Sequence, residues 1–241
     1  MRIQTNDRID RDGAMANFVK VPLKGIHKVN ADLSYAKAAF VEPLACVIRG
    51  MDNAKPKAGE SIIILGAGPI GLMFTQLLSH SPVSKIIAVY LDRRRLEMAN
   101  KLGADDIVQA GDNVETEISR LTDGRGADLV IEAIGSPVTG EIALRTVKRG
   151  GRIVFFGVHP MNARMQIDPF DAFYTKEVEI KGSFCSPLGT FPRAVKLIES
   201  GRIDIESLVT SEYPLQETAR AFEILENKTE GPIKLMIRPN E

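Results

Sequence analysis

Cysteine and histidine are scarce in this sequence, which has two cysteines and three histidines in 241 residues. Cys46 and Cys185 lie far apart and form no CxxC pair, so their spacing supports neither a disulfide framework nor a structural zinc site. Low cysteine usage of this kind predicts a reducing compartment, and we therefore expect a cytoplasmic protein.

An excess of either charge is also missing, because 31 basic residues balance 31 acidic residues. The densest basic run, Arg93 to Arg95, is three residues long, which argues against a nucleic-acid partner. No apolar run approaches the ~20 residues of a membrane-spanning helix, so no membrane partner is expected. Residues 1–12 are polar and charged, unlike a secretory signal peptide. These absences leave an ordinary globular protein, with 44% hydrophobic and 26% charged residues.

Short apolar runs alternate with helix-like stretches through the middle of the chain. The run Ile62 to Leu65 is continuous and mostly β-branched, as in a parallel strand buried on both faces. The predicted strands are 62–65, 86–89, 106–108, 128–133, 152–157 and 179–183, and the predicted helices are 70–80, 93–102, 114–121 and 139–147. Such alternation predicts an α/β fold, a doubly wound parallel sheet of the Rossmann type.

The two ends of the chain have a different character. Before the alternating region we expect a strand at 14–21 closed by Pro22, and a helix from Ser34 to Ile48 that is broken at Pro43. Gly150 and Gly151 predict a turn. After the alternating region we expect helices at 191–200 and 218–226, an extended segment at 212–215 and a strand at 234–237. We divide the chain into residues 1–43, a dinucleotide-binding domain at 44–186, and residues 187–241, the flanks being remnants of a barrel-like lobe.

The strongest local signal is a glycine fingerprint, G-x-G-x-x-G, which follows the strand at 62–65 and opens a helix. Gly66 permits a tight turn, Gly68 lets the backbone approach a diphosphate, and Gly71 allows close packing of helix on strand. The helix begins at Pro69 and Ile70, and its N-terminus offers free backbone N–H donors to an anion. The alternative is a glycine-rich turn without a ligand, but the surrounding strand and helix favour a dinucleotide.

The sequence leaves the choice between NAD and NADP open. The position where an acidic residue would bind the adenosine ribose is Tyr90, and Asp92 comes two residues late, just before Arg93 to Arg95. Asp92 on the ribose favours NAD, whereas Tyr90 on the adenine and an arginine on a 2′-phosphate favour NADP. NAD is the expectation, with NADP as the alternative.

Two further segments follow predicted strands, at the sheet edge where this fold binds its ligand. They are Glu132 to Ser136 after the fourth strand, with Ala133, Ile134 and Gly135 as the candidate cofactor residues, and Phe156, Gly157 and Val158 after the fifth. Small residues and backbone groups suit a planar nicotinamide, although the two glycines could equally be turns that end the strands.

Several motifs together resemble the zinc-dependent medium-chain dehydrogenases, above all the branch of sorbitol, threonine and butanediol dehydrogenases. The motifs are V-E-P-L at 41–44, the fingerprint at 66–71, L-G-A-D at 102–105, G-G at 150–151 and I-K-G-S-F at 180–184, and the likeness runs from about residue 13 to residue 237. The resemblance implies NAD-linked oxidation of a secondary alcohol, polyol or amino alcohol to a ketone, with a zinc ion that polarises the alcohol.

The resemblance also implies roles for individual residues. Glu42 matches a glutamate at the catalytic zinc of that branch, whereas its spacing alone suits a helix residue that interacts with the dipole. Phe156 to Val158, together with Ser183 and Phe184, match segments that hold the carboxamide of the nicotinamide. Arg95 matches a basic position near the adenosine ribose, and Tyr90 departs from the acidic residue that the family usually has.

The zinc ligands that this family carries in its N-terminal lobe are missing. The family has a cysteine and a G-H-E motif there, and no histidine of this chain precedes a glutamate; the four-cysteine zinc loop is absent as well. A separate chain could supply the missing lobe, and the family commonly forms homo-oligomers through the last strands of the sheet, here between residues 152 and 186. The remaining hypotheses are a stand-alone dinucleotide-binding module without catalysis, and a quinone-reductase-like enzyme that uses NADPH without zinc.

Overall fold

The computed structural model describes residues 13–226 and 231–239. The chain forms two compact units, one made of residues 30–205 and the other of the described parts of residues 1–29 and 206–241. In these ranges, no helix is both long and apolar enough to cross a lipid bilayer.

The larger unit contains a six-stranded sheet in the order β3-β2-β1-β4-β5-β6, and every neighbouring pair is parallel. The order reverses between β1 and β4, which is the switch point where doubly wound sheets bind ligands. The strands are β1 Ser61–Leu65, β2 Lys85–Tyr90, β3 Asp106–Gln109, β4 Ala127–Glu132, β5 Val147–Phe155 and β6 Glu179–Gly182. The predicted fold class is therefore confirmed.

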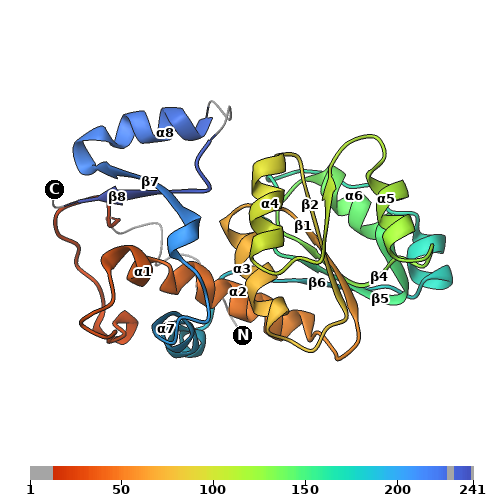
Figure 1. Cartoon of the computed structure of the whole chain (residues 1–241), viewed down its shortest axis with the longest axis horizontal. Helices are drawn as coiled ribbons and strands as arrows, with labels where there is room; N and C mark the ends of the chain where they lie inside the picture. The colour runs from red at the N-terminus through yellow and green to blue at the C-terminus, as the bar shows by residue number, and fades with distance from the viewer. Residues whose placement is uncertain (1–12, 227–230, 240–241) are drawn as a thin grey trace. The chain divides into compact units, whose positions relative to one another are not determined.

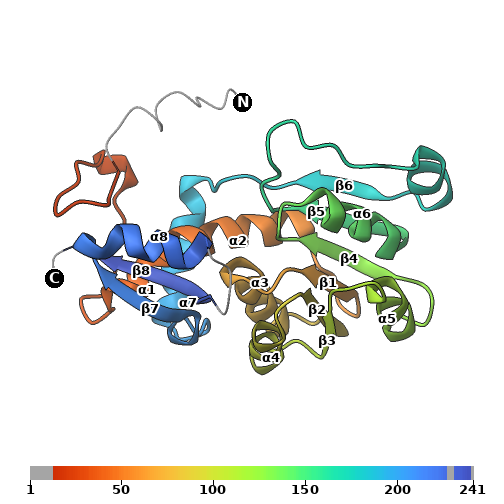
Figure 2. The same cartoon turned by 90° about the horizontal axis from the view of Figure 1, so that it is seen from above.

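Helices cover both faces of this sheet (Figures 1 and 2). On one face α3 contacts β1 and β2, and α4 contacts β2 and β3, whereas on the other face α5 and α6 pack together and α6 contacts β4 and β5. The helices of this unit are α1 Tyr35–Ala39, α2 Val41–Ala54, α3 Pro69–Ser79, α4 Arg93–Lys101, α5 Val114–Leu121, α6 Pro137–Thr146 and α7 Phe191–Glu199. A π-helix, Phe170–Thr175, lies between β5 and β6.

The core lies at the centre of the sheet. Residues Ile62 to Leu65 of β1 are at most 1% exposed, and Leu129 to Ile131 of β4 are fully buried. Both central strands are covered by helices on two faces, which is why their sequences are continuously apolar and do not alternate. The buried sheet fixes the ends of the strands, and these ends position the candidate site.

The smaller unit contains a βαβ arrangement of its own. Strand β7, Val209–Pro214, pairs in parallel with β8, Lys234–Arg238, and helix α8, Thr218–Glu226, lies between them in the sequence. In Figure 1 these three elements are drawn in blue beside one another. The C-terminal strand is thus paired with β7.

Three sequence predictions about local structure are wrong. Residues 14–21 form bends and irregular chain, not a strand, and Phe18 is 93% exposed. Alternation predicts a face for a strand but not a partner, and a strand without a neighbour is not stable. The helical break falls at Phe40, between α1 and α2, while Pro43 lies in the first turn of α2, where its missing N–H is not needed.

The third error concerns Gly150 and Gly151, which lie inside β5 and do not form a turn before it. The register of β5 on β4 shifts between Val147 and Arg152, so the glycines occupy an irregular stretch of the strand, and Gly150 has φ +67°. From Val147 to Arg152, β5 advances five residues while β4 advances two, and a glycine with positive φ helps to accommodate such extra residues.

Candidate dinucleotide site

Five strands end in one row at the same edge of the sheet. The register joins Val89 of β2 to Leu65 of β1, Leu65 to Glu132 of β4, Glu132 to Phe155 of β5, and Phe155 to Gly182 of β6. Every residue predicted to bind the cofactor follows this row within a few positions. The sheet therefore brings all the predicted segments to one edge, the carboxyl edge, where parallel sheets bind ligands.

The glycine fingerprint has the geometry that a diphosphate site requires. Gly66 has φ +125°, and a Cβ on Gly71 would lie 1.8 Å from the Gly66 carbonyl oxygen, so the turn and the helix are in close contact. Gly68 is the N-cap of α3 with Pro69 and Ile70 following it, and a Cβ on Gly68 would have no atom within 4 Å. Open space thus lies before a helix N-terminus, and the fingerprint fits a dinucleotide.

The loops after β4 and β5 pack backbone against backbone beside the fingerprint. A Cβ on Gly157 would lie 2.1 Å from the Gly135 nitrogen, and a Cβ on Gly135 would lie 2.4 Å from the Val158 carbonyl oxygen. A Cβ on Gly66 would lie 3.3 Å from the carbonyl oxygen of Ala133 and 3.1 Å from a side-chain carbon of Ile134. The glycines of both loops are therefore required by close packing and not only by strand termination.

Strand β2 ends beside a small cluster of polar groups. Asp92 is the N-cap of α4, and its carboxylate accepts hydrogen bonds from the N–H of Arg94 at 2.9 Å and of Arg95 at 3.4 Å. Although burial opposes ionisation, these bonds and the charge of Arg94 hold the pKa of Asp92 below its ordinary value. The Arg95 guanidinium lies 5.6 Å from the Tyr90 ring centroid and 3.4 Å from its hydroxyl. Asp92 is thus a helix cap with compensated charge.

The segment after β6 is fixed by helix α2. Ser183 is 6% exposed, and its hydroxyl accepts a hydrogen bond from the Asn53 side-chain amide at 3.1 Å, whereas Phe184 is 62% exposed. Phe156 packs edge to face against Phe74 of α3, with centroids 5.1 Å apart. The sequence did not single out Asn53, because its partner lies 130 residues away and no local pattern signals such a contact.

Glu132 is a second residue to which the sequence analysis assigned no role, although it places a carboxylate at the end of an apolar run. Its side chain is fully buried, and Oε2 has no hydrogen-bond partner in the described residues. A buried carboxylate is retained only where it is strongly hydrogen-bonded, which points to a specific role at this edge of the sheet.

Glu42, the predicted zinc ligand, lies in the first turn of α2 and accepts a hydrogen bond from the Cys46 thiol at 3.2 Å. Burial, followed by the hydrogen bond and charge of Glu42, raises the pKa of Cys46 to about 12, so this thiol stays protonated. Among the residues that the structure describes, no group of three or more His, Cys, Asp or Glu side chains could hold a metal ion. These residues alone do not fit a catalytic zinc, and the role of Glu42 stays a prediction.

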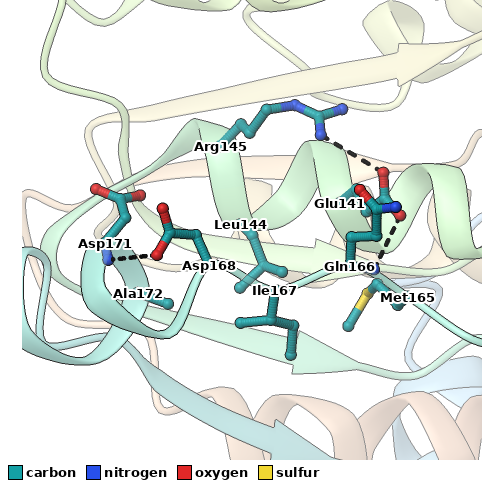
Figure 3. Close-up of a pocket in the computed structure, with 9 residues that line it drawn as sticks. All are labelled: Glu141, Leu144, Arg145, Met165, Gln166, Ile167, Asp168, Asp171 and Ala172. Atoms are coloured by element: carbon teal, nitrogen blue, oxygen red, sulfur yellow. Dashed lines mark hydrogen bonds and ion pairs between the residues drawn. The ribbon is translucent and has the colours of Figure 1, made fainter.

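A cavity of about 650 Å³ lies between α6 and the segment before the π-helix, and it includes none of the predicted site residues (Figure 3). Two carboxylates that line it, those of Glu141 and Asp168, already have partners within the protein. Glu141 accepts a hydrogen bond from the N–H of Gln166 at 3.0 Å and pairs with Arg145 at 3.6 Å, while Asp168 accepts one from the N–H of Asp171 at 3.2 Å. The bond between Glu141 and Gln166 fastens the segment to α6, and the bond between Asp168 and Asp171 lies at the start of the π-helix, so these two carboxylates stabilise the fold.

Comparisons with known proteins agree with this geometry. A family model described as zinc-binding dehydrogenase matches residues 69–200. The chain is 33% identical over 231 residues to the sorbitol dehydrogenase of Bacillus subtilis, covering 95% of this chain and 64% of that protein. The chain thus spans about two thirds of the length of the curated relatives that it matches.

Two solved structures with bound dinucleotides are similar. One, from Sinorhizobium meliloti 1021, is described as a zinc-binding dehydrogenase bound to NADP; it has a TM-score of 0.85 and 31% identity, over 95% of this chain and 67% of that one. The other, from Escherichia coli CFT073, is described as a short chain alcohol dehydrogenase with NADH; it has a TM-score of 0.81 and 25% identity, over 89% and 63%. Matched over more than half of its length by the family model, the chain belongs to the zinc-binding dehydrogenase family.

Proposed function

We propose that this chain binds NAD(P) along the row of strand ends and takes part in hydride transfer between a secondary alcohol or polyol and the nicotinamide. The observation that carries the proposal is the open space before Gly68 at the N-terminus of α3, in line with the loops that follow β4 and β5. The bound nicotinamide would supply the hydride acceptor or donor.

The residues of this chain would bind and orient the dinucleotide. The N–H groups of the first turn of α3 would bind the diphosphate, and Gly68 would let the backbone approach it. The backbones of the loops at 133–135 and 156–158 would form a rigid wall for the nicotinamide. Ser183 and Phe184 would lie beside the carboxamide, and the exposed Phe184 ring would limit the access of water. Holding the ring in one geometry is itself a large part of catalysis.

We further propose that the site accepts NADP(H) at least as well as NAD(H). An acidic residue rejects the 2′-phosphate of NADP through its negative charge. Here the Asp92 carboxylate lies 3.4 Å from the Arg94 guanidinium and 3.9 Å from that of Arg95, so its charge is compensated. We expect the Kd for NADH to be equal to or larger than the Kd for NADPH. A Kd for NADH that is about tenfold smaller than the Kd for NADPH would contradict the proposal.

The substrate class and the partners are part of the proposal. Sorbitol dehydrogenase and D-arabitol-phosphate dehydrogenase are among the relatives, which favours a polyol or a related secondary alcohol over a quinone. A homo-oligomer through β6 is proposed because β6 pairs only with β5 in the described chain, which leaves an open sheet edge. A separate chain that supplies zinc ligands, the domain boundaries at 43 and 186, and the cytoplasmic location stay predictions.

Hydride transfer is tested by following the absorbance of NAD(P)H with sorbitol, xylitol and a simple secondary alcohol, with and without added Zn²⁺. Oxidation that depends on Zn²⁺ is expected only where another subunit or lobe completes the metal site, because the described residues alone do not fit a catalytic zinc. Dinucleotide binding without turnover under all conditions would favour the stand-alone module. Reduction of a quinone by NADPH in the presence of a chelator would instead favour the quinone-reductase-like alternative.

A further inference from the structure

Glu132 is bonded to the loop that follows it. Its Oε1 accepts hydrogen bonds from the N–H of Ile134 at 2.9 Å and of Gly135 at 2.8 Å, and from the hydroxyl of Thr139 at 2.8 Å. The same Thr139 hydroxyl lies 2.9 Å from the Ser136 carbonyl, so its one hydrogen is shared between two acceptors at the start of α6. One carboxylate oxygen therefore fixes the whole turn between β4 and α6.

The backbone of the same residue fixes the neighbouring loop. The Glu132 carbonyl accepts hydrogen bonds from the N–H of Phe156 and of Gly157, both at 2.9 Å. Gly157 and Gly135 are in backbone contact, so a shift of either loop would displace the other.

The side chain is buried at a cost in free energy that packing alone does not explain. Glu132 is 0% exposed, no cation pairs with it among the described residues, and Oε2 has no hydrogen-bond partner there. An apolar side chain of similar volume would fill the same space without this penalty. An apolar side chain could not accept these three hydrogen bonds, and it would not set the direction of the Ile134 and Gly135 N–H groups.

We propose that Glu132 is a positioning residue that holds the loops at 133–135 and 156–158 in the geometry that binds the nicotinamide half of the dinucleotide. Glu132 does not touch the cofactor itself. The adenosine and diphosphate half would lie against the fingerprint and the end of β2, to which the Glu132 side chain makes no hydrogen bond among the described contacts. This proposal rests on the proposed dinucleotide site. It assigns Glu132 an effect on the nicotinamide half of that site and none on the adenosine and diphosphate half.

The experiment compares the affinity of the full chain for NADH, which spans both halves, with its affinity for ADP, which lacks the nicotinamide half. In Glu132→Gln the neutral amide oxygen is a weaker acceptor, and a nitrogen that needs an acceptor replaces Oε2. We expect the Kd for NADH to rise about tenfold, or about 1.4 kcal/mol, while the Kd for ADP changes less than about twofold. The fluorescence of bound NADH should shift toward that of free NADH.

Asp128→Asn is a matched control on the same strand. Asp128 also accepts hydrogen bonds at a strand end, from the N–H of Ser61 at 2.9 Å and its hydroxyl at 2.8 Å, but it lies at the opposite end of β4. We expect this variant to lower the melting temperature without changing the ratio of the two Kd values. A merely structural role of Glu132 would make the two variants behave alike.

Thr139→Val is the second test, because it removes one of the three hydrogen bonds to Oε1 and keeps the carboxylate. We expect a rise of about threefold in the Kd for NADH and none for ADP, even if Glu132→Gln fails to fold. Equal changes for NADH and ADP, or no change in either variant, would overturn the positioning role. If the wild-type chain binds both NADH and ADP but the variants change the two Kd values equally, only this proposal is refuted, whereas a wild-type chain that binds neither refutes the proposed function as well.

Discussion

The ion pair between Arg152 of β5 and Glu60, which precedes β1, gives a quantitative test of how the larger unit is held together. The guanidinium donates to both carboxylate oxygens, at 2.9 Å and 2.6 Å, and the side chains are only 15% and 11% exposed. Glu60 also accepts a hydrogen bond from the N–H of Lys57 at 2.7 Å, and Arg152 donates to the Ala54 carbonyl at 3.3 Å. The pair thus links the sheet to the end of α2.

Removing one partner leaves a charge or a polar group buried without its partner, so Glu60→Gln and Arg152→Met should each lower the free energy of unfolding by about 3 kcal/mol. For a chain of this size, that corresponds to a fall in melting temperature of about 6–12 °C. The double variant Glu60→Met with Arg152→Met should lose much less than the sum of the two single losses, because no unpaired charge remains.

The assay is urea unfolding followed by circular dichroism, with Arg125→Met as the control. Arg125 pairs with Asp123 at 3.2 Å, but both side chains are about four-fifths exposed, at 78% and 82%. Its loss should change stability by roughly 0–1 kcal/mol. Single losses at Glu60 and Arg152 below about 1 kcal/mol, or losses that add in the double variant, would refute the reasoning.

The pH dependence of stability follows from the same pair. Burial alone would raise the pKa of Glu60, but the hydrogen bonds from Arg152 and from the N–H of Lys57 hold it below its ordinary value of 4.5. A lowered pKa in the folded state stabilises the protein above pH 4.5, and this contribution is lost as the pH falls from 4.5 through the folded pKa. Glu60→Gln should flatten the stability curve in this acidic window and not above it.

Other variants test the site. Gly68→Ala should leave the melting temperature nearly unchanged but weaken dinucleotide binding at least tenfold, because its methyl group enters open space where the diphosphate would lie. Gly71→Ala should instead destabilise the fold by more than about 1 kcal/mol, since its Cβ would lie 1.8 Å from a backbone oxygen, and equal melting temperatures for the two variants would contradict this. Asp92→Ala should cost about 1 kcal/mol through loss of the helix cap, measured by urea unfolding. Because the pKa of Cys46 is raised to about 12, iodoacetamide should modify it far more slowly than free cysteine at pH 8, and Glu42→Gln should speed the reaction.

The sheet could be predicted from the sequence because its signals are local. The β-branched run at Ile62 to Leu65 and the fingerprint that follows it fix a strand, a tight turn and a helix, and the repeating pattern fixes the parallel order. The strand at 14–21 failed because alternation carries no information about a partner. The π-helix at 170–175 was not predicted, since such insertions have no periodicity of their own.

The site was predictable as a set of segments but not as a set of contacts. The position of each segment follows from the rule that parallel strands place their carboxyl ends together, and the register confirms that row. The hydrogen bond between Asn53 and Ser183 joins residues that are 130 positions apart, and no local pattern reveals it. Glu132 carried a signal, a carboxylate that closes a buried run, whose meaning depended on the fold of the loop after it.

We expect this chain to form a dinucleotide site without a complete set of zinc ligands. Calorimetric titration of the purified chain with NADH and with NADPH, together with a zinc determination on the same sample, tests it most directly. We expect saturable binding of one dinucleotide per chain and no stoichiometric zinc. A chain that binds neither dinucleotide, or that holds one equivalent of zinc, would contradict the account.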